Sequence, residues 1–198
     1  MLENHQRVGA IGIFFASDLL SVYADSSSVL SGSGGLLSRH GIHKPAYYAF
    51  RFLHQLGRDK LAQTANCIVT EESKNDIRIL CFNSKALGPK YYLVEENAHR
   101  PQELNGLYSD LEPLWMELVL EGMEAPAYHI RQRVLNAEKG SVLDKWAALD
   151  CAENLTRSNL ERTAMPEMLM EKAAPAGGDL RLKFRMEPNE MRMIIITA

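Results

Sequence analysis

The chain has 198 residues, of which 46% are hydrophobic and 24% charged, so it is long enough for one ordinary packed domain and a piece of another. Its formal net charge is -3 and its basic residues are scattered singly, which argues against nucleic acid or an anionic membrane as a partner. No apolar run approaches a membrane span and the first residues lack signal-peptide features, so we expect a cytoplasmic location and no membrane contact.

The first predicted elements are a buried strand at 8–18, VGAIGIFFASD, and a helix that Pro45 opens and Gly57 closes. The polar, glycine-rich loop SGSGGLL at 31–37 lies between them. Strand, loop and helix in this order predict one βα unit.

After Gly57 the apolar residues mostly alternate with period two, as in half-buried antiparallel strands. Strands are predicted at 66–71, 77–82, 90–95, 113–121, 127–135, 180–186 and 190–197. The segment LEPLWMELVLEGM also fits a helical period, but Pro113 and the need to close the sheet favour a strand. Two short helices are expected, one capped by Ser141 and one that Thr156 caps and that ends before Pro166. Together these elements predict a β-sandwich.

Candidate sites for cofactors, metals and nucleophiles are weak. The glycine-rich loop continues Leu36-Leu37-Ser38, without the Lys-Ser or Lys-Thr pair of a phosphate-binding loop, and its spacing fails the dinucleotide fingerprint. The six histidines include no pair with metal-ligand spacing, and no nucleophile elbow is present. The cysteines are odd in number and read as three buried, reduced thiols: Cys67, Cys81 and Cys151. We therefore expect no cofactor and no metal.

Aromatic side chains leave one binding chemistry open. The tryptophans at 115 and 146 and the tyrosines at 47, 48, 91 and 92 could stack on a sugar, although core or interface packing is favoured for them.

The string GGLLSRHGIHKPAYYAFRFLHQLG resembles the end of the catalytic barrel in glycoside hydrolase family 39, the β-xylosidase and α-iduronidase family. Its glycine loop, the Ile42–Pro45 turn and the aromatic helix ending at Gly57 carry this likeness. Similar motifs continue through the strand that ends at Asn83, the stretch from Asn136 to Trp146, Pro166 and the final strands, and so cover nearly the whole chain.

The resemblance implies a mainly β fold: an antiparallel β-sandwich with a few short helices, preceded by the last βα unit of an incomplete (β/α)8 barrel. Residues 1–57 would be the eighth strand, loop and eighth helix of that barrel, and residues 58–198 the accessory sandwich. Family members are retaining hydrolases whose two catalytic glutamates would both lie before Met1. The resemblance thus implies no catalytic residue and no activity in this chain alone.

The resemblance also implies which residues remain of the sugar cleft. Phe14 falls where family β-xylosidases have a tryptophan, and Asp18 matches an acid, so both are candidate substrate-binding residues at the end of the eighth strand. Ser21, Val22 and Gly34 replace residues that hold or face the sugar in xylosidases, which weakens the case for xyloside specificity.

Two parent proteins remain open, beside a third interpretation in which the sandwich is a stand-alone carbohydrate-binding module. The first is a glycosidase that acts on a xyloside-like carbohydrate. The second is an AraC-type transcriptional regulator, because Ser17–Leu20 and Glu190–Arg192 look more like a divergent branch of the family attached to such regulators. In either case, the surface left by the missing barrel units, with Phe50, Leu53 and Leu56, should pair with another copy or dock on the sandwich.

Overall fold

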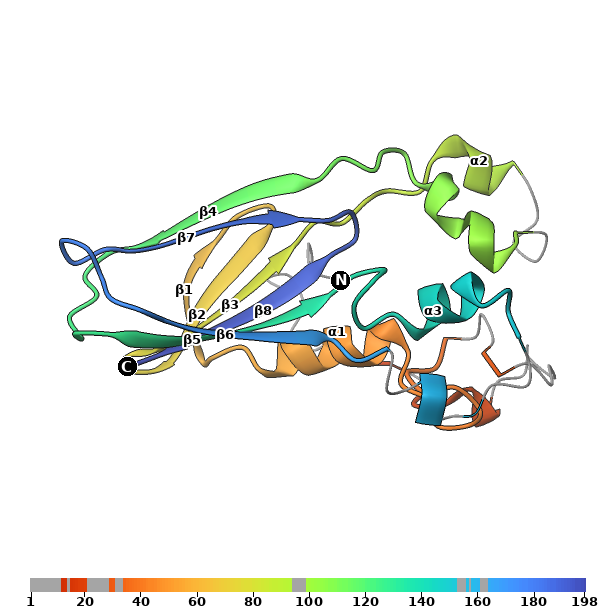
Figure 1. Cartoon of the computed structure of the whole chain (residues 1–198), viewed down its shortest axis with the longest axis horizontal. Coiled ribbons are helices and arrows are strands. Elements are labelled where there is room, and N and C mark those ends of the chain that lie inside the picture. The colour runs from red at the N-terminus through yellow and green to blue at the C-terminus, as the bar shows by residue number, and fades with distance from the viewer. Residues whose placement is uncertain are drawn as a thin grey trace.

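Two β-sheets face each other in this protein (Figure 1). The computed structural model describes residues 12–13, 15–20, 29–30, 34–93, 99–152, 156, 158–160 and 164–198. The large sheet has six strands in the order β1-β2-β3-β8-β5-β6, and the small sheet pairs β4 with β7; all these pairings are antiparallel. The predicted fold class, a mainly antiparallel β-sandwich with a few short helices, is confirmed.

The large sheet consists of β1 (Asp59–Gln63), β2 (Cys67–Ser73), β3 (Asp76–Phe82), β5 (Tyr128–Leu135), β6 (Glu167–Ala173) and β8 (Met191–Thr197). The small sheet consists of β4 (Leu114–Leu120) and β7 (Leu180–Met186). The helices are α1 (Pro45–His54), α2 (Pro89–Tyr92) and α3 (Val142–Ala148), with 3-10 turns η2 (Asp18–Leu20) and η4 (Pro101–Leu107).

The main core fills the space between the two sheets, because alternate residues of each strand point inward. Ile79 and Cys81 of β3 meet Leu182 and Met186 of β7 there, and all four are buried. Leu80 points to the opposite face of the large sheet and belongs to a different cluster. The alternation predicted from the sequence is therefore confirmed in both sheets.

Helix α1 packs on the outer face of the large sheet, on the side opposite β4 and β7 (Figure 1). Tyr48 and Phe52 are buried against Leu80, Leu135 and Met193, with Leu53 and Leu56 at the edge of the same cluster. The apolar face of the predicted helix thus docks on the sandwich.

Gly57 has a different role from the predicted one. The helix already ends at His54, and a Cβ atom on Gly57 would lie 2.4 Å from the carbonyl carbon of Glu71 in β2. The glycine is required because the chain passes close to this strand as it enters the sheet.

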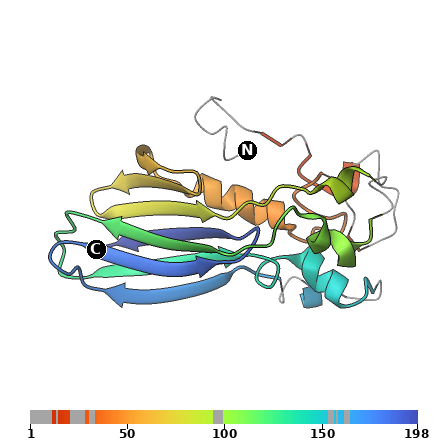
Figure 2. The same ribbon diagram turned by 90° about the horizontal axis from the view of Figure 1, so that it is seen from above.

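The short helices gather at one end of the sandwich (Figure 2). Ser141 caps α3 as predicted, since its Oγ accepts a hydrogen bond from the Asp144 N–H at 3.3 Å. Residues 158–160, after Thr156, are helical, and Leu160 is buried with Trp146 in a cluster at this end.

Three strand predictions need correction. The strand predicted at 90–95 is wrong, because a short helix begins there at Pro89, after Gly88. The fixed φ of proline suits the first turn of a helix. Strands β1 and β6 were missed. Both are edge strands whose residues are largely exposed on both faces, so their sequences lack alternation.

The N-terminal part of the chain is only partly described. The strand predicted at 8–18 lies mainly outside the described residues; within them, Ser17 forms a parallel β-bridge with Leu37. The predicted domain boundary at residue 57 stays a prediction. Helix α1 shares a hydrophobic cluster with β3, β5 and β8 across that boundary.

Two of the three cysteines are buried, as predicted. Cys67 and Cys81 lie opposite each other on β2 and β3 with their sulfur atoms 3.6 Å apart. The hydrogen bond with Cys67, together with burial, holds the pKa of Cys81 above its usual value. Cys151 is only partly buried, so the prediction of a buried thiol is wrong there: it lies in a turn after α3, near Gln102.

Candidate functional site

Asp18, one of the two predicted substrate-binding residues, is buried with 3% of its surface exposed. Lys44 Nζ lies 3.0 Å from its Oδ2 and 3.2 Å from its Oδ1, and the Gly35 N–H donates to Oδ1 at 2.9 Å. The carboxylate therefore ties the chain near residue 18 to the glycine loop and to the residue that precedes α1. Its role in substrate binding stays a prediction, and Phe14, the other predicted residue, lies outside the described residues.

The close approach of Asp18 to the glycine loop explains why position 35 is a glycine. A Cβ atom at this position would lie 2.4 Å from Asp18 Oδ1 and 2.6 Å from the Asp18 backbone nitrogen. Only glycine lets the loop approach the carboxylate closely enough to donate its N–H. The loop thus serves the Asp18–Lys44 pair.

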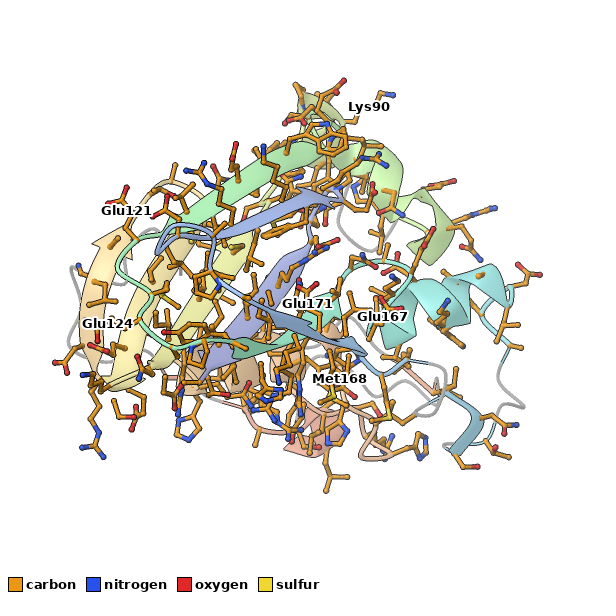
Figure 3. The ribbon with its side chains drawn as sticks, turned by 60° about the vertical axis from the view of Figure 1, so that its left-hand side comes forward. Lys90, Glu121, Glu124, Glu167, Met168 and Glu171 are labelled. Carbon is orange, nitrogen blue, oxygen red and sulfur yellow. The ribbon has the colours of Figure 1, made fainter. Side chains whose placement is uncertain are left out.

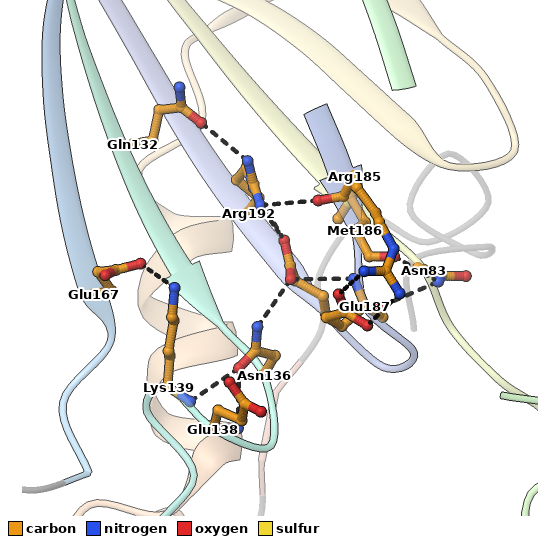
Figure 4. A network of polar contacts seen from close by, with 11 residues as sticks. Asn83, Gln132, Asn136, Glu138, Lys139, Glu167, Arg185, Met186, Glu187 and Arg192 are labelled. Atoms are coloured by element: carbon orange, nitrogen blue, oxygen red, sulfur yellow. Dashed lines mark hydrogen bonds and ion pairs between the residues drawn. The ribbon is translucent and has the colours of Figure 1, made fainter. Parts of the chain in front are cut away.

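A buried polar network connects the ends of β5, β7 and β8 (Figure 4). The Arg192 guanidinium donates to Glu190 Oε1 from Nε at 3.0 Å and from Nη2 at 2.7 Å, and Glu190 Oε2 accepts from Asn136 Nδ2 at 2.9 Å. Arg192 also reaches Gln132 Oε1 and the Arg185 carbonyl, and its guanidinium lies 4.4 Å from the centroid of the Phe184 ring. A buried charge pair with these extra partners holds its side chains in fixed positions.

Asn83 fixes the turn between β7 and β8. Its side-chain nitrogen lies within hydrogen-bond distance of the carbonyl oxygens of Glu112 (3.2 Å), Met186 (3.4 Å) and Glu187 (3.1 Å). Its backbone N–H donates to the Glu190 carbonyl at 2.9 Å, and its own carbonyl accepts from Asn189. Both Asn83 and Asn136 belong to the motifs that suggested family 39, and both have a structural role here.

A groove of about 650 Å³ opens beside this network. Its walls come from four segments: the first turns of α1, the chain around Tyr108, the turn from β5 into α3, and the turn from β7 into β8. The apolar part of the lining includes Ala46, Ala49, Leu104, Leu111, Leu143 and Met191, and the polar part includes Asn136, Glu138, Ser141, Asp144, Arg185, Glu187 and Asn189. Such a mixture suits a polar ligand or a partner surface.

Two of the three groove carboxylates, Asp144 and Glu187, have structural partners. Asp144 accepts a hydrogen bond from the Ser141 hydroxyl in the cap of α3, and Glu187 pairs with Arg185 at 3.2 Å. Burial, with the nearby Asp144 charge, raises the pKa of Tyr108 above its usual value. None of these contacts of Asp144, Glu187 and Tyr108 sets up an acid and a base around a bond to be cleaved.

Sequence reasoning missed this groove, because its residues come from segments that only the folded chain brings together. Ser141 was identified as a cap, but nothing in its neighbourhood predicted a cavity. Of the aromatic residues considered for sugar stacking, Trp146 and Tyr48 are core residues as favoured, whereas Trp115 and Tyr92 lie on the surface.

Within the described ranges, no three histidine, cysteine, aspartate or glutamate side chains are grouped so that they could bind a metal ion. The helices in those ranges are all too short or too polar to cross a bilayer.

No protein-family model matches the chain. The chain is 23% identical over 196 residues to a β-xylosidase of Geobacillus stearothermophilus, a match that covers 98% of this chain and 35% of that protein. Among solved structures, a monomeric β-xylosidase from Caulobacter crescentus CB15 matches 98% of this chain and 38% of its own with a TM-score of 0.76 and 16% identity. A GH39 β-xylosidase from Caulobacter crescentus matches 98% and 37% with a TM-score of 0.68 and 18% identity.

The chain therefore resembles a portion of GH39 β-xylosidases and spans little more than a third of their length. At these identities the solved structures establish the fold, a β-sandwich of the kind found in these proteins.

Proposed function

We propose that the chain is the C-terminal, non-catalytic portion of a family-39-like glycosidase of the retaining β-xylosidase type. The observation that carries the proposal is the extent of the Geobacillus match, which includes 98% of this chain but 35% of the relative. A match of this shape is expected when one polypeptide corresponds to the supporting part of a larger enzyme. Hydrolysis of an O-glycosidic bond would belong to the complete protein, with a xyloside-like carbohydrate as substrate.

In this proposal the sandwich supports the barrel through α1. Tyr48 and Phe52 bury the helix in the same cluster as residues of β3, β5 and β8. If α1 is the eighth barrel helix, it is part of both domains and fixes the orientation of the barrel on the sandwich. The Asp18–Lys44 pair lies at the start of this helix and would keep the end of the eighth strand, with Phe14 and Asp18, at the rim of the sugar cleft.

The chemistry would be supplied by two carboxylates from the remainder of the parent protein. A retaining pair must lie roughly 5 Å apart across the sugar. The groove carboxylates Asp144 and Glu187 have structural partners instead. We therefore expect this chain to be inactive when isolated.

The decisive experiment is to sequence the genomic locus across Met1 and to express the complete reading frame. We expect a barrel with two glutamates after its fourth and seventh strands, and hydrolysis of p-nitrophenyl β-D-xylopyranoside by the complete protein. The control is the 198-residue chain alone, which should leave the substrate intact. A helix-turn-helix region, with no glutamate at either barrel position, would overturn the proposal in favour of a regulator.

A further inference from the structure

Part of the outer face of the large sheet is left open beside α1. The register aligns three rows of side chains there across β8, β5 and β6: Thr197–His129–Lys172, Ile195–Arg131–Met170 and Met193–Arg133–Met168. Helix α1 covers Met193 and Leu135 at one end of this surface. We call the part beside these residues, formed by Arg131, Arg133, Met168, Met170 and Ile195, the open strip; Ile195 lies at its border and packs partly against the α1 cluster.

The open strip is cationic. Arg131 and Arg133 lie on the same face of β5, and Arg51 projects from α1 near them. No side-chain ion pair or side-chain hydrogen bond of these three arginines is present in the part of the chain that the structure describes. Partial burial, and then the Arg51 and Arg131 charges, lower the pKa of Arg133 below its ordinary value.

The nearest acidic side chains on the sheet are already used. Asp76 and Glu72 pair with Arg78, and Glu167 pairs with Lys139. Glu171 points to the other face of β6 and accepts a hydrogen bond from Gln132 at 3.0 Å. The other titratable groups along the strip, His129 and Lys172, are themselves basic.

Apolar side chains flank the arginines. Met168 is 54% exposed and Met170 74% exposed, and Figure 3 shows Met168 extending from β6 on the side opposite Glu171. A hollow of about 350 Å³ runs along this surface and is lined by Arg131, Met170 and Ile195 and by the neighbouring Ile130 and Glu171, with His129, Lys172 and Thr197 at its far end. Exposed methionines beside unpaired arginines are typical of a surface that a partner covers.

We propose that the open strip is the binding site of a second helix, which is acidic on one side and apolar on the other. The barrel of the parent protein would supply this helix. The carboxylates of this helix would complement the positive charges of Arg51, Arg131 and Arg133. Its apolar side chains would pack against Met168, Met170 and Ile195. Three neighbouring strands are about 10 Å across, which matches the diameter of one α-helix, about 10 Å.

The source of the helix rests on the proposed function. The helices of a (β/α)8 barrel form a closed ring, so the eighth helix has a neighbour on each side. If α1 is that eighth helix, a neighbour packed about 8 to 10 Å away would lie over the strip.

The test uses the 198-residue chain and a synthetic amphipathic helix with glutamates on one face and leucines on the other. Binding is measured by isothermal titration calorimetry at low salt. We expect the double variant Arg131→Gln/Arg133→Gln to weaken binding roughly tenfold or more. The matched control is Arg181→Gln/Lys183→Gln, which removes the same charge from the outward face of β7 and should change the affinity less than about twofold.

Three results would overturn the proposal: no binding to the wild-type chain, equal losses in both double variants, or tighter binding of a short DNA duplex than of the peptide. A helix with serine in place of leucine should bind more weakly, and equal binding would remove the apolar part of the assignment. Circular dichroism melts confirm that each variant is folded.

The outcomes also separate the two proposals. If the peptide fails to bind and the locus encodes an active xylosidase, only the helix-binding role of the open strip is refuted. A peptide that binds as expected, with a regulator encoded at the locus, would leave the strip as a docking surface and refute the proposed function.

Discussion

At the scale of single residues, we expect stability to depend strongly on the buried pair of Glu190 and Arg192. Their side chains are 2% and 11% exposed, and together they connect three strands. Removal of one partner from a buried pair leaves the other charge uncompensated in a poorly solvated site, which costs far more than the loss of an exposed pair.

We therefore expect Glu190→Gln to lower the free energy of unfolding by about 3 kcal/mol. The control is Glu117→Gln, since Glu117 pairs with Lys183 at 3.1 Å on the exposed face of the small sheet. That change should cost less than about 1 kcal/mol. Urea denaturation of both variants measures the difference, and equal losses would show that the buried network is not a stabilising unit.

The contacts of single residues were the part that could least be predicted from the sequence. Asp18 could be singled out from a family likeness, but its ion pair with Lys44 depends on how the glycine loop folds back. Arg131 and Arg133 could be assigned to one face of a strand from their spacing alone. That Met170 and Ile195 lie on either side of Arg131 depends on strand pairing between distant segments, which local periodicity does not encode.

At the scale of elements, α1 docks on the sheet through two buried aromatic side chains, Tyr48 and Phe52. Phe52 is buried between the helix and the sheet, whereas Phe50 on the same helix is only partly buried and lies outside that cluster. We expect Phe52→Ala to lower the free energy of unfolding by about 3 kcal/mol or more, and Phe50→Ala by about 1 kcal/mol.

Hydrogen exchange gives a second measurement on the variants Phe52→Ala and Phe50→Ala. In Phe52→Ala, the amides of α1 should exchange faster than those of β3 and β8, because the helix would detach before the sandwich opens. If Phe50→Ala is as costly as Phe52→Ala, or if α1 and β8 remain equally protected in Phe52→Ala, the helix is held by contacts other than this cluster.

The elements that the sequence could predict are those with at least one buried face. β5 and β7 alternate because their inner residues fill the core, β3 contributes apolar residues to a cluster on each of its faces, and Pro45 and Ser141 are local signals for helix starts. β6, with the sequence EMLMEKA, exposes both faces and contains good helix formers, so only its pairing with β5 makes it a strand. Tertiary pairing, rather than local preference, decides such segments.

At the scale of the whole molecule, the ends of the large sheet remain candidates for self-association. β1 and β6 are edge strands, and β6 exposes Met168, Leu169 and Met170 in succession. An exposed apolar edge can pair with the same edge of another copy.

We expect the isolated chain to associate reversibly as its concentration rises, and Met170→Lys to weaken this association because a charged lysine protects a sheet edge. The control is Met165→Lys, since Met165 is also exposed but lies before β6. Sedimentation velocity measures the distribution of species. A strictly monomeric wild-type chain at millimolar concentration would contradict the expectation.

The place of β8 in the large sheet has a consequence for the order of events during protein synthesis. β8 is made after every other strand, yet it lies between β3 and β5 and pairs along its whole length with both. Before the ribosome has released it, β1, β2 and β3 form one sheet fragment and β5 and β6 another, each with an open edge. The large sheet can close only after β8 has left the ribosome, so the nascent chain is most exposed to aggregation and to chaperones just before β8 emerges.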